Sequence, residues 1–98
     1  MLNQVILVGR IVDIRKSENR TLLNLCVPRS FKNENGEYEN DIIKCVLMGN
    51  IATNTLEYCR HGDLIGIKGR LQSVGRNDIL SVVAEKVTFL SSKKVEEE

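Results

Sequence analysis

The chain has no tryptophan, a single proline, and an aromatic fraction of only 4% of its 98 residues. An interior built with so few rings must rely on valine, isoleucine and leucine, which favours β-sheet. No apolar run is long enough to cross a membrane as a helix, and the apolar start lacks the basic segment and cleavage site of a signal peptide. These absences predict one small, β-rich domain in a cytosolic protein.

Residues that carry chemistry are equally scarce. There is one histidine, His61, and the three cysteines Cys26, Cys45 and Cys59 are widely spaced, with no Cys-x-x-Cys pair. This pattern fits buried free thiols in a reducing compartment better than a zinc site. The chain also lacks a phosphate-binding loop, a Ser-His-Asp set and a paired-carboxylate motif. We therefore predict no enzymatic activity, no cofactor and no metal.

The most informative segment that is present lies at residues 3–11. In an extended strand, Val5, Leu7 and Ile11 lie on one face, while Ile6 and Val8 lie on the other. An N-terminal strand is often an edge strand, which needs only one buried face. A second apolar face must be buried against another layer or another subunit. We therefore predict that residues 5–8 form an oligomer interface.

Turn signals separate short apolar runs rich in β-branched residues, which predict strands rather than long helices. One short helix fits between the third and fourth runs, with Asn50 as its N-cap and Gly62 after its end. The predicted strands are residues 3–15, 21–30, 38–48, 64–73 and 79–90, and the predicted helix is residues 51–59. This order is that of the all-β, five-stranded Greek-key barrel called the OB-fold. The domain is expected to span residues 1–91, followed by a short, charged, disordered tail at residues 92–98.

Two kinds of residue mark irregular points in these strands. Pro28 cannot donate a ladder hydrogen bond, so it predicts an edge or the exit of the second strand. Gly66 and Gly69 in the fourth strand predict tight curvature, which a small barrel needs at its corners.

The basic residues are candidates for contacts with a polyanion. The net charge is +1, but without Glu96, Glu97 and Glu98 the remaining chain has about four more basic than acidic residues. Lys68 and Arg70 share one face of a strand. A charged exterior that is merely solvated remains the alternative for each residue. The candidates are Arg10, Arg29, Lys32, Lys44, Lys68, Arg70 and Arg76.

The four aromatic residues differ in their expected roles. Phe31 precedes a polar turn and is the first candidate for stacking on a nucleic-acid base, with Tyr38 across the same hairpin as the second. Tyr58, in the predicted helix, is expected to pack against the barrel. Phe89, in the last strand, is expected to lie in the core.

The opening Asn-Gln-Val-Ile-Leu-Val-Gly-Arg resembles the first strand of the bacterial and phage single-stranded DNA-binding protein family. The resemblance implies an OB-fold, base stacking at Phe31 and a homotetramer built from dimers, with a dimer as the alternative. Further blocks that look like the family are residues 31–37 (the loop after strand two), 41–50 (strand three and its turn), 51–52 and 56–59 (the helix), 61–71 (strand four) and 83–90 (strand five).

The chain also departs from the better-known family members. Ile42 stands where many carry tryptophan and Met48 where many carry phenylalanine, and the loop at residues 74–78 is short. Family members usually continue into a tail with an acidic tip that docks replication and repair enzymes, whereas this chain stops with three glutamates. The resemblance is therefore to a short form, similar in length to the primosomal replication protein N, for which partners among replication proteins are in doubt.

Three hypotheses follow. The first is sequence-tolerant binding of single-stranded DNA in replication, recombination or repair, by a bacterial or phage-encoded, nucleoid-associated protein. The second is an OB-fold adaptor for protein interaction in a primosome-like assembly, with weak nucleic-acid binding. The third is an RNA-binding OB domain, which differs only in substrate.

Overall fold

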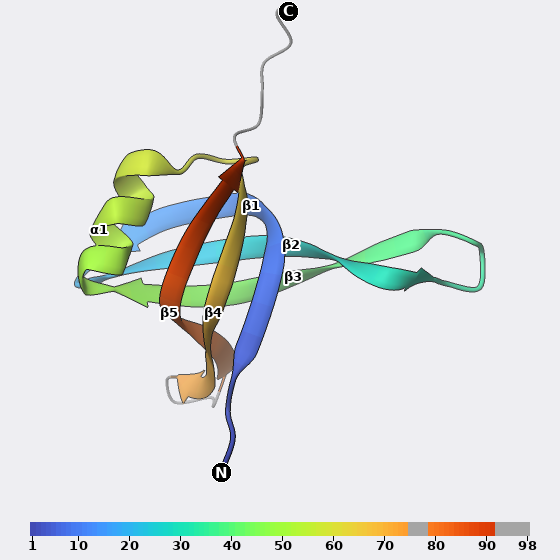
Figure 1. Cartoon of the computed structure of the whole chain (residues 1–98), viewed down its shortest axis with the longest axis horizontal. Helices are drawn as coiled ribbons and strands as arrows, with labels where there is room; N and C mark the ends of the chain where they lie inside the picture. Colours follow the sequence, from blue (N-terminus) through green and yellow to red (C-terminus); the bar gives the residue numbers. More distant parts are fainter. Residues whose placement is uncertain (75–78, 92–98) are drawn as a thin grey trace, which may run out of the picture.

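The computed structural model describes residues 1–74 and 79–91. Five strands close into a barrel in the order β1-β2-β3-β5-β4, and α1 connects β3 to β4 (Figure 1). The fold class predicted from the sequence is confirmed. The elements are β1 (Val5–Ser17), β2 (Arg20–Lys32), β3 (Tyr38–Met48), α1 (Gly49–Tyr58), β4 (Leu64–Val74) and β5 (Ile79–Ser91).

β1 changes partner halfway along its length. Residues 5–10 pair antiparallel with β4, and residues 10–17 pair antiparallel with β2, with a register shift between Ile11 and Asp13. The premise that the N-terminal strand is an edge strand therefore holds only for its first half: residues 5–9 pair with β4 alone, whereas β1 as a whole lies between two neighbours in the closed order. A short parallel pairing between β3 and β5 closes the barrel.

The core is aliphatic, as the composition predicts. Alternate residues of each strand point inward, and the largest side chains with less than 2% exposure include Ile11, Leu23, Leu25, Leu47, Ile65 and Ile67. Burying each of these side chains stabilises the fold by about 1.5–3 kcal/mol relative to leaving it in water. α1 adds Ala52 and Thr55 to the buried residues.

The helix and two aromatic rings differ from the prediction. α1 begins at Gly49 with Met48 as its N-cap, so Asn50 lies inside the helix and caps nothing. Tyr58 does not pack against the barrel, because Cys59, directly after the helix, takes the buried position and leaves Tyr58 68% exposed. Phe89 is not in the core either: it is 49% exposed and lines a shallow cleft between α1 and β5.

All three cysteines are free thiols, as expected, but only Cys45 and Cys59 are buried, whereas Cys26 on the outward side of β2 is partly exposed. Burial raises the pKa of the Cys45 thiol to about 12, so this group stays protonated at neutral pH. Burial and then the charge of Asp63 also raise the pKa of Cys59. Within residues 1–74 and 79–91, no helix has the length and apolar character required to span a membrane, and no cluster of potential metal ligands forms.

Candidate nucleic-acid interface

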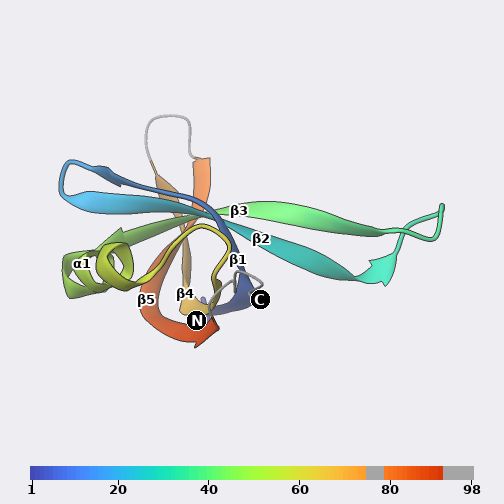
Figure 2. The same cartoon turned by 90° about the horizontal axis from the view of Figure 1, so that it is seen from above.

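The hairpin formed by β2 and β3 projects well beyond the barrel (Figures 1 and 2). Its register shifts between Pro28 and Lys32, and β2 continues past Pro28 to Lys32, so the proline does not mark the exit of the strand toward the loop. Pro28 lies beyond Cys26, the last residue of β2 that pairs with β1, so it occupies an edge, the other predicted alternative. The turn is organised by Asn33, whose Oδ1 accepts hydrogen bonds from the N–H groups of Asn35 (2.9 Å) and Glu37 (3.0 Å). Gly36 supplies the positive φ of 77° that the turn requires. The hairpin is thus a defined arm.

The arm carries both aromatic residues proposed for stacking. Phe31 is 68% exposed and Tyr38 is 59% exposed. Lys32 and Tyr38 are cross-strand partners, and the Lys32 ammonium lies 5.7 Å from the centre of the Tyr38 ring. Phe31 directly precedes Lys32 in the same strand, so the two rings are expected on opposite faces of the arm. A nucleic-acid strand whose bases stack on both rings must therefore pass around the edge of the arm.

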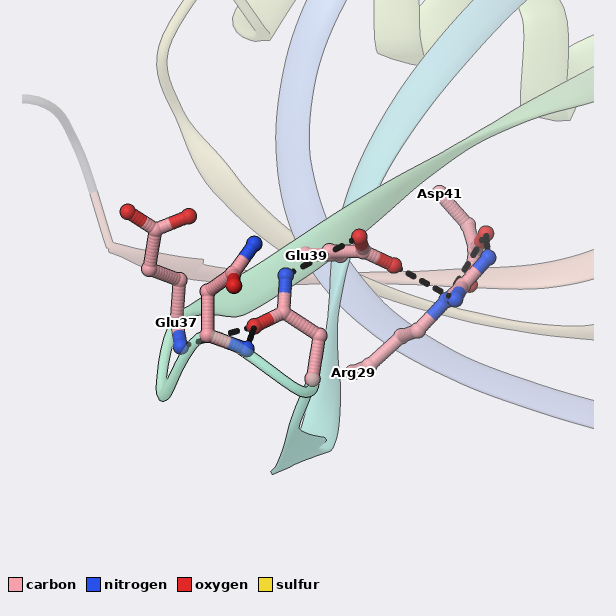
Figure 3. A network of polar contacts seen from close by, with 6 residues as sticks. Arg29, Glu37, Glu39 and Asp41 are labelled. Carbon is pink, nitrogen blue, oxygen red and sulfur yellow. Dashed lines mark hydrogen bonds and ion pairs between the residues drawn. The ribbon is translucent and has the colours of Figure 1, made fainter.

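Arg29 holds the base of the arm through two carboxylates (Figure 3). Its Nη1 lies 2.8 Å from Glu39 Oε1, and its Nη2 lies 2.9 Å from Asp41 Oδ1. Asn33 Nδ2 donates a further hydrogen bond of 3.1 Å to Glu39 Oε2. The positive charge of Arg29 is therefore compensated before any ligand arrives, which weakens its predicted role as a phosphate contact.

The same contacts set the protonation of this network. The hydrogen bond from Arg29 holds the pKa of Asp41 below its usual value of 3.8, and Asp41 in turn raises the pKa of Arg29. Because the pKa of Asp41 is depressed in the folded state, its contact with Arg29 stabilises the fold fully at a pH above the usual pKa of this carboxyl group. This stabilisation is lost as the pH falls through the lowered pKa of the folded state. At neutral pH both Arg29 and Asp41 are therefore charged.

Removing both carboxylates is expected to strengthen DNA binding. The double substitution Glu39→Gln and Asp41→Asn frees Arg29 and removes two negative charges beside the path of the phosphates. We expect affinity for oligo-dT to rise by about threefold at low salt, since exposed charge pairs have modest energies. Fluorescence anisotropy measures the change. In the parent protein Arg29→Gln should change affinity much less, and a large loss from that variant would show that Arg29 contacts DNA despite its partners.

The outward side of β1, β2 and β3 forms a basic surface. Since Leu23 and Leu25 point into the core, Leu22, Asn24 and Cys26 point out. The register then places Arg10, Cys26 and Ile42 in one row across the sheet. The next row consists of Asp13, Asn24 and Lys44.

The register adds two cations that the sequence interpretation missed. Arg15 pairs with Leu22, and Arg20 pairs with Met48, so both belong to this outward side. Neither has a carboxylate within 4 Å among residues 1–74 and 79–91. No local pattern identifies them, because their common side with Lys44 depends on the register of three strands. We call this surface the basic face: it carries the four cations Arg10, Arg15, Arg20 and Lys44 and one carboxylate, Asp13. Ile42 (58% exposed) and Met48 (48% exposed) are its apolar contacts.

The remaining predicted cations are not all gathered there. Arg10 lies on the basic face, but its Nη1 donates a hydrogen bond of 2.9 Å to the carbonyl of Gly62. Arg70 pairs with Glu85 at 3.1 Å. Lys68 lies on a different side of the barrel, in a row with Ile6 and Lys86. Arg76 and the predicted tail at residues 92–98 lie outside the described residues.

The closed five-stranded barrel with a helix between β3 and β4 defines the protein as an OB-fold. Solved structures with this fold include an SSB of Plasmodium falciparum in complex with ssDNA (TM-score 0.72, 21% identity, covering 93% of this chain and 96% of that one). A small single-stranded DNA-binding protein from Streptomyces coelicolor is also similar (TM-score 0.63, 17% identity, covering 91% of this chain and 94% of that one).

Residues 2–95 match the single-strand binding protein family, and the chain belongs to it. Single-stranded DNA-binding protein B of Bacillus subtilis is 37% identical over 106 residues, which cover 95% of this chain and 94% of that protein. Single-stranded DNA-binding protein 1 of Clostridium acetobutylicum is 36% identical, with 95% and 97% covered. The Bacillus cereus relative is 38% identical over 95% of this chain, which spans 62% of that longer protein. The family description names binding and no reaction, in agreement with the prediction of a protein that is not an enzyme.

Proposed function

We propose that this protein binds single-stranded DNA without strong sequence preference. The observation that carries the proposal is the juxtaposition, in a chain of this family, of the basic face with an arm that exposes Phe31 and Tyr38. The cations of the basic face neutralise phosphates and release their counterions. The rings stack on bases, and because every base has a flat face, stacking tolerates any sequence.

Salt dependence tests this proposal. We expect tight binding of fluorescent oligo-dT at low salt, much weaker binding of duplex DNA, and a linear fall of log K with log salt concentration. The slope for single strands is about −0.7 per neutralised phosphate, so one phosphate at each of the four cations of the basic face predicts a slope near −3. Anisotropy titrations at several salt concentrations measure it. Absence of binding at micromolar protein and low salt would refute the proposal.

A comparison of DNA with RNA in the same experiment tests the substrate and the process. Roles in replication, recombination or repair require DNA, so oligo-dT should bind more tightly than oligo-rU of equal length. Equal or tighter binding of oligo-rU would instead support the RNA-binding alternative, because a site that reads the 2′-hydroxyl distinguishes the two. The bacterial origin of the relatives supports a bacterial or phage-encoded protein that acts at the nucleoid in the cytoplasm.

The alternative function as a protein-interaction adaptor is favoured by one specific observation. Arg29 and Arg70 are already neutralised by carboxylates, and Ile42 and Met48 offer no aromatic faces, so several positions expected to hold DNA are weak. This alternative predicts poor oligonucleotide binding together with a primosome-like protein partner that survives nuclease treatment. Tight oligo-dT binding with no such partner would exclude it.

We further propose that the protein is a homo-oligomer that uses β1. Among the predicted interface residues, Val5 and Leu7 pack against the protein's own core, whereas Ile6 is 69% exposed and Val8 is 50% exposed. Residues 5–9 pair with β4 only, so their other edge offers backbone groups to a second copy. The family resemblance implies a tetramer. The like charges of Lys68 and Lys86 beside Ile6 favour a dimer, since face-to-face stacking would bury them.

Light scattering after size-exclusion chromatography measures the assembly. Val8→Glu places a charge on the exposed apolar side of β1, and we expect it to shift the protein to the monomer, because a buried unpaired charge is costly. Tyr58→Glu, at an exposed aromatic residue on α1, is the matched control and should leave the mass unchanged. A monomeric parent protein would refute the proposed interface.

A further inference from the structure

We infer that Asn35, at the tip of the arm, is a site of spontaneous deamidation, which converts this residue to aspartate or isoaspartate and weakens DNA binding. Asparagine is a thermolabile residue. It reacts most readily when glycine follows it, because glycine has no side chain to shield its backbone nitrogen. Asn35 is followed by Gly36, and both residues are exposed. The effect on DNA binding rests on the proposed function, whereas the reaction itself does not.

The reaction consumes one water molecule and releases one ammonia molecule. The backbone nitrogen of Gly36 loses its proton to a base and attacks Cγ of the Asn35 side chain, which closes a five-membered succinimide ring. The bond between Cγ and the side-chain nitrogen breaks, and the nitrogen leaves as ammonia. Water then opens the ring at either of its carbonyl carbons. One opening gives aspartate and the other gives isoaspartate, and nothing is oxidised or reduced.

The geometry of the tip leaves the reacting groups accessible. In the part of the chain that the structure describes, the side chain of Asn35 makes no hydrogen bond, so its amide can turn toward the next residue. A Cβ atom placed on Gly36 would meet nothing within 4 Å, so the ring has room to form. The N–H of Gly36 donates one hydrogen bond of 3.0 Å to the carbonyl of Asn33. This bond must open before the attack, and bonds at exposed loop tips open at low cost.

Two other asparagines of the arm lack this combination. Asn33 is followed by a glutamate, its Oδ1 accepts two hydrogen bonds, and its Nδ2 donates to Glu39 at 3.1 Å. Asn40 is followed by an aspartate and lies within β3, opposite Pro28. The inference therefore singles out Asn35 among the three.

Conversion to isoaspartate disrupts the turn that shapes the arm. The N–H groups of residues 35, 36 and 37 all donate hydrogen bonds to oxygens of Asn33. In isoaspartate the backbone runs through the former side chain, which adds one atom between the first and the second of these N–H groups. The three bonds then no longer fit one residue. The turn directly joins Lys32 to its cross-strand partner Tyr38, so the Tyr38 ring loses its fixed position.

Both products also add a negative charge to the tip of the arm. Glu34 and Glu37 already lie in this turn, so a third carboxylate increases the repulsion of phosphates there. Aspartate acts through this charge alone, whereas isoaspartate combines the charge with the altered backbone. We therefore expect isoaspartate to weaken DNA binding more than aspartate does.

Mass spectrometry of the full chain, fresh and after warm incubation at mildly alkaline pH, tests the reaction. Trypsin cleaves after Lys32 and Lys44 and releases residues 33–44 as one peptide. We expect fragmentation to place the new carboxylate at Asn35 in the aged protein only, with Asn33 and Asn40 in the same peptide unchanged as internal controls. Asn35→Gln, whose longer side chain closes a ring far more slowly, is the matched variant and should stay unconverted.

An isoaspartyl methyltransferase should label the aged parent protein and not the aged Asn35→Gln variant. An aged parent protein without conversion at Asn35 would overturn the inference. Equal conversion at Asn33 or Asn40 would overturn it too, because the geometry of the tip would then select nothing.

Oligo-dT titrations of the same samples test the consequence. We expect about fivefold weaker binding after full conversion, because a stacking ring that is no longer ordered must be immobilised on binding. Fresh Asn35→Asp should bind about twofold more weakly, since it adds only an exposed charge. Aged and fresh Asn35→Gln should bind alike. Full conversion with unchanged affinity would overturn the effect on DNA binding. A fresh parent protein that binds no oligo-dT would refute the proposed function, while conversion at Asn35 would still establish the modification site.

Discussion

Phe31→Ala is expected to weaken oligo-dT binding by about 5- to 150-fold, because one base–aromatic stack contributes about 1–3 kcal/mol. The ring is 68% exposed at the end of β2, so its removal takes almost no buried surface from the fold. The melting temperature should therefore stay within about 2 °C of the parent value, as for other surface substitutions. Anisotropy with labelled oligo-dT and thermal unfolding of the same samples measure the two effects.

The control for this experiment is another exposed ring. Phe89→Ala removes a phenyl group that is 49% exposed beside α1, away from the arm, and should leave oligo-dT affinity unchanged. Tyr38→Ala should cause an intermediate loss, because the tyrosine ring is already occupied on one side by Lys32. If Phe31→Ala binds like the parent protein, Phe31 is not a stacking residue, and the DNA path must follow the basic face alone.

The sequence predicted the elements because their pattern is local. β3 was predicted at residues 38–48 and observed at Tyr38–Met48. The apolar run from Ile42 to Met48, interrupted only by Lys44 and bounded by turn residues, is visible without knowing any neighbour. The exposure of Phe31 followed in the same way from the polar turn beside it. The start of α1 was misplaced because Asn50 is a good capping residue, whereas the backbone turns into the helix already at Gly49.

The parts that failed depend on contacts between distant residues. Arg29 looked like a free cation, because only the register of β2 against β3 brings Glu39 and Asp41 beside it. Arg15 and Arg20 were missed because their common side with Lys44 appears only when three strands are aligned. A basic surface on a barrel is thus a property of register, and individual lysines and arginines in the sequence do not reveal it.

Register also makes Gly69 a glycine whose substitution should cost much stability. It lies in β4, where the pairing with β5 shifts between Lys68 and Gly69. A Cβ atom at this position would overlap the carbonyl oxygen of Val83 and lie 3.2 Å from the Cα of Ala84. Both obstacles are backbone of the adjacent strand, so no side-chain rotation relieves them. Gly69→Ala is expected to lower the free energy of unfolding by about 3 kcal/mol.

The matched control lies three residues away in the same strand. A Cβ atom at Gly66 would meet its nearest neighbours, Leu7 O and Leu90 Cδ1, at 3.8 Å, which is an ordinary contact distance. Gly66→Ala should therefore change stability by less than about 1 kcal/mol, and it gains from reduced freedom of the unfolded chain. In thermal unfolding Gly69→Ala should melt about 15 °C below Gly66→Ala, since 1 kcal/mol corresponds to about 4–8 °C in a domain of this size. Equal melting temperatures would mean that the backbones of β4 and β5 do not approach each other closely at Gly69.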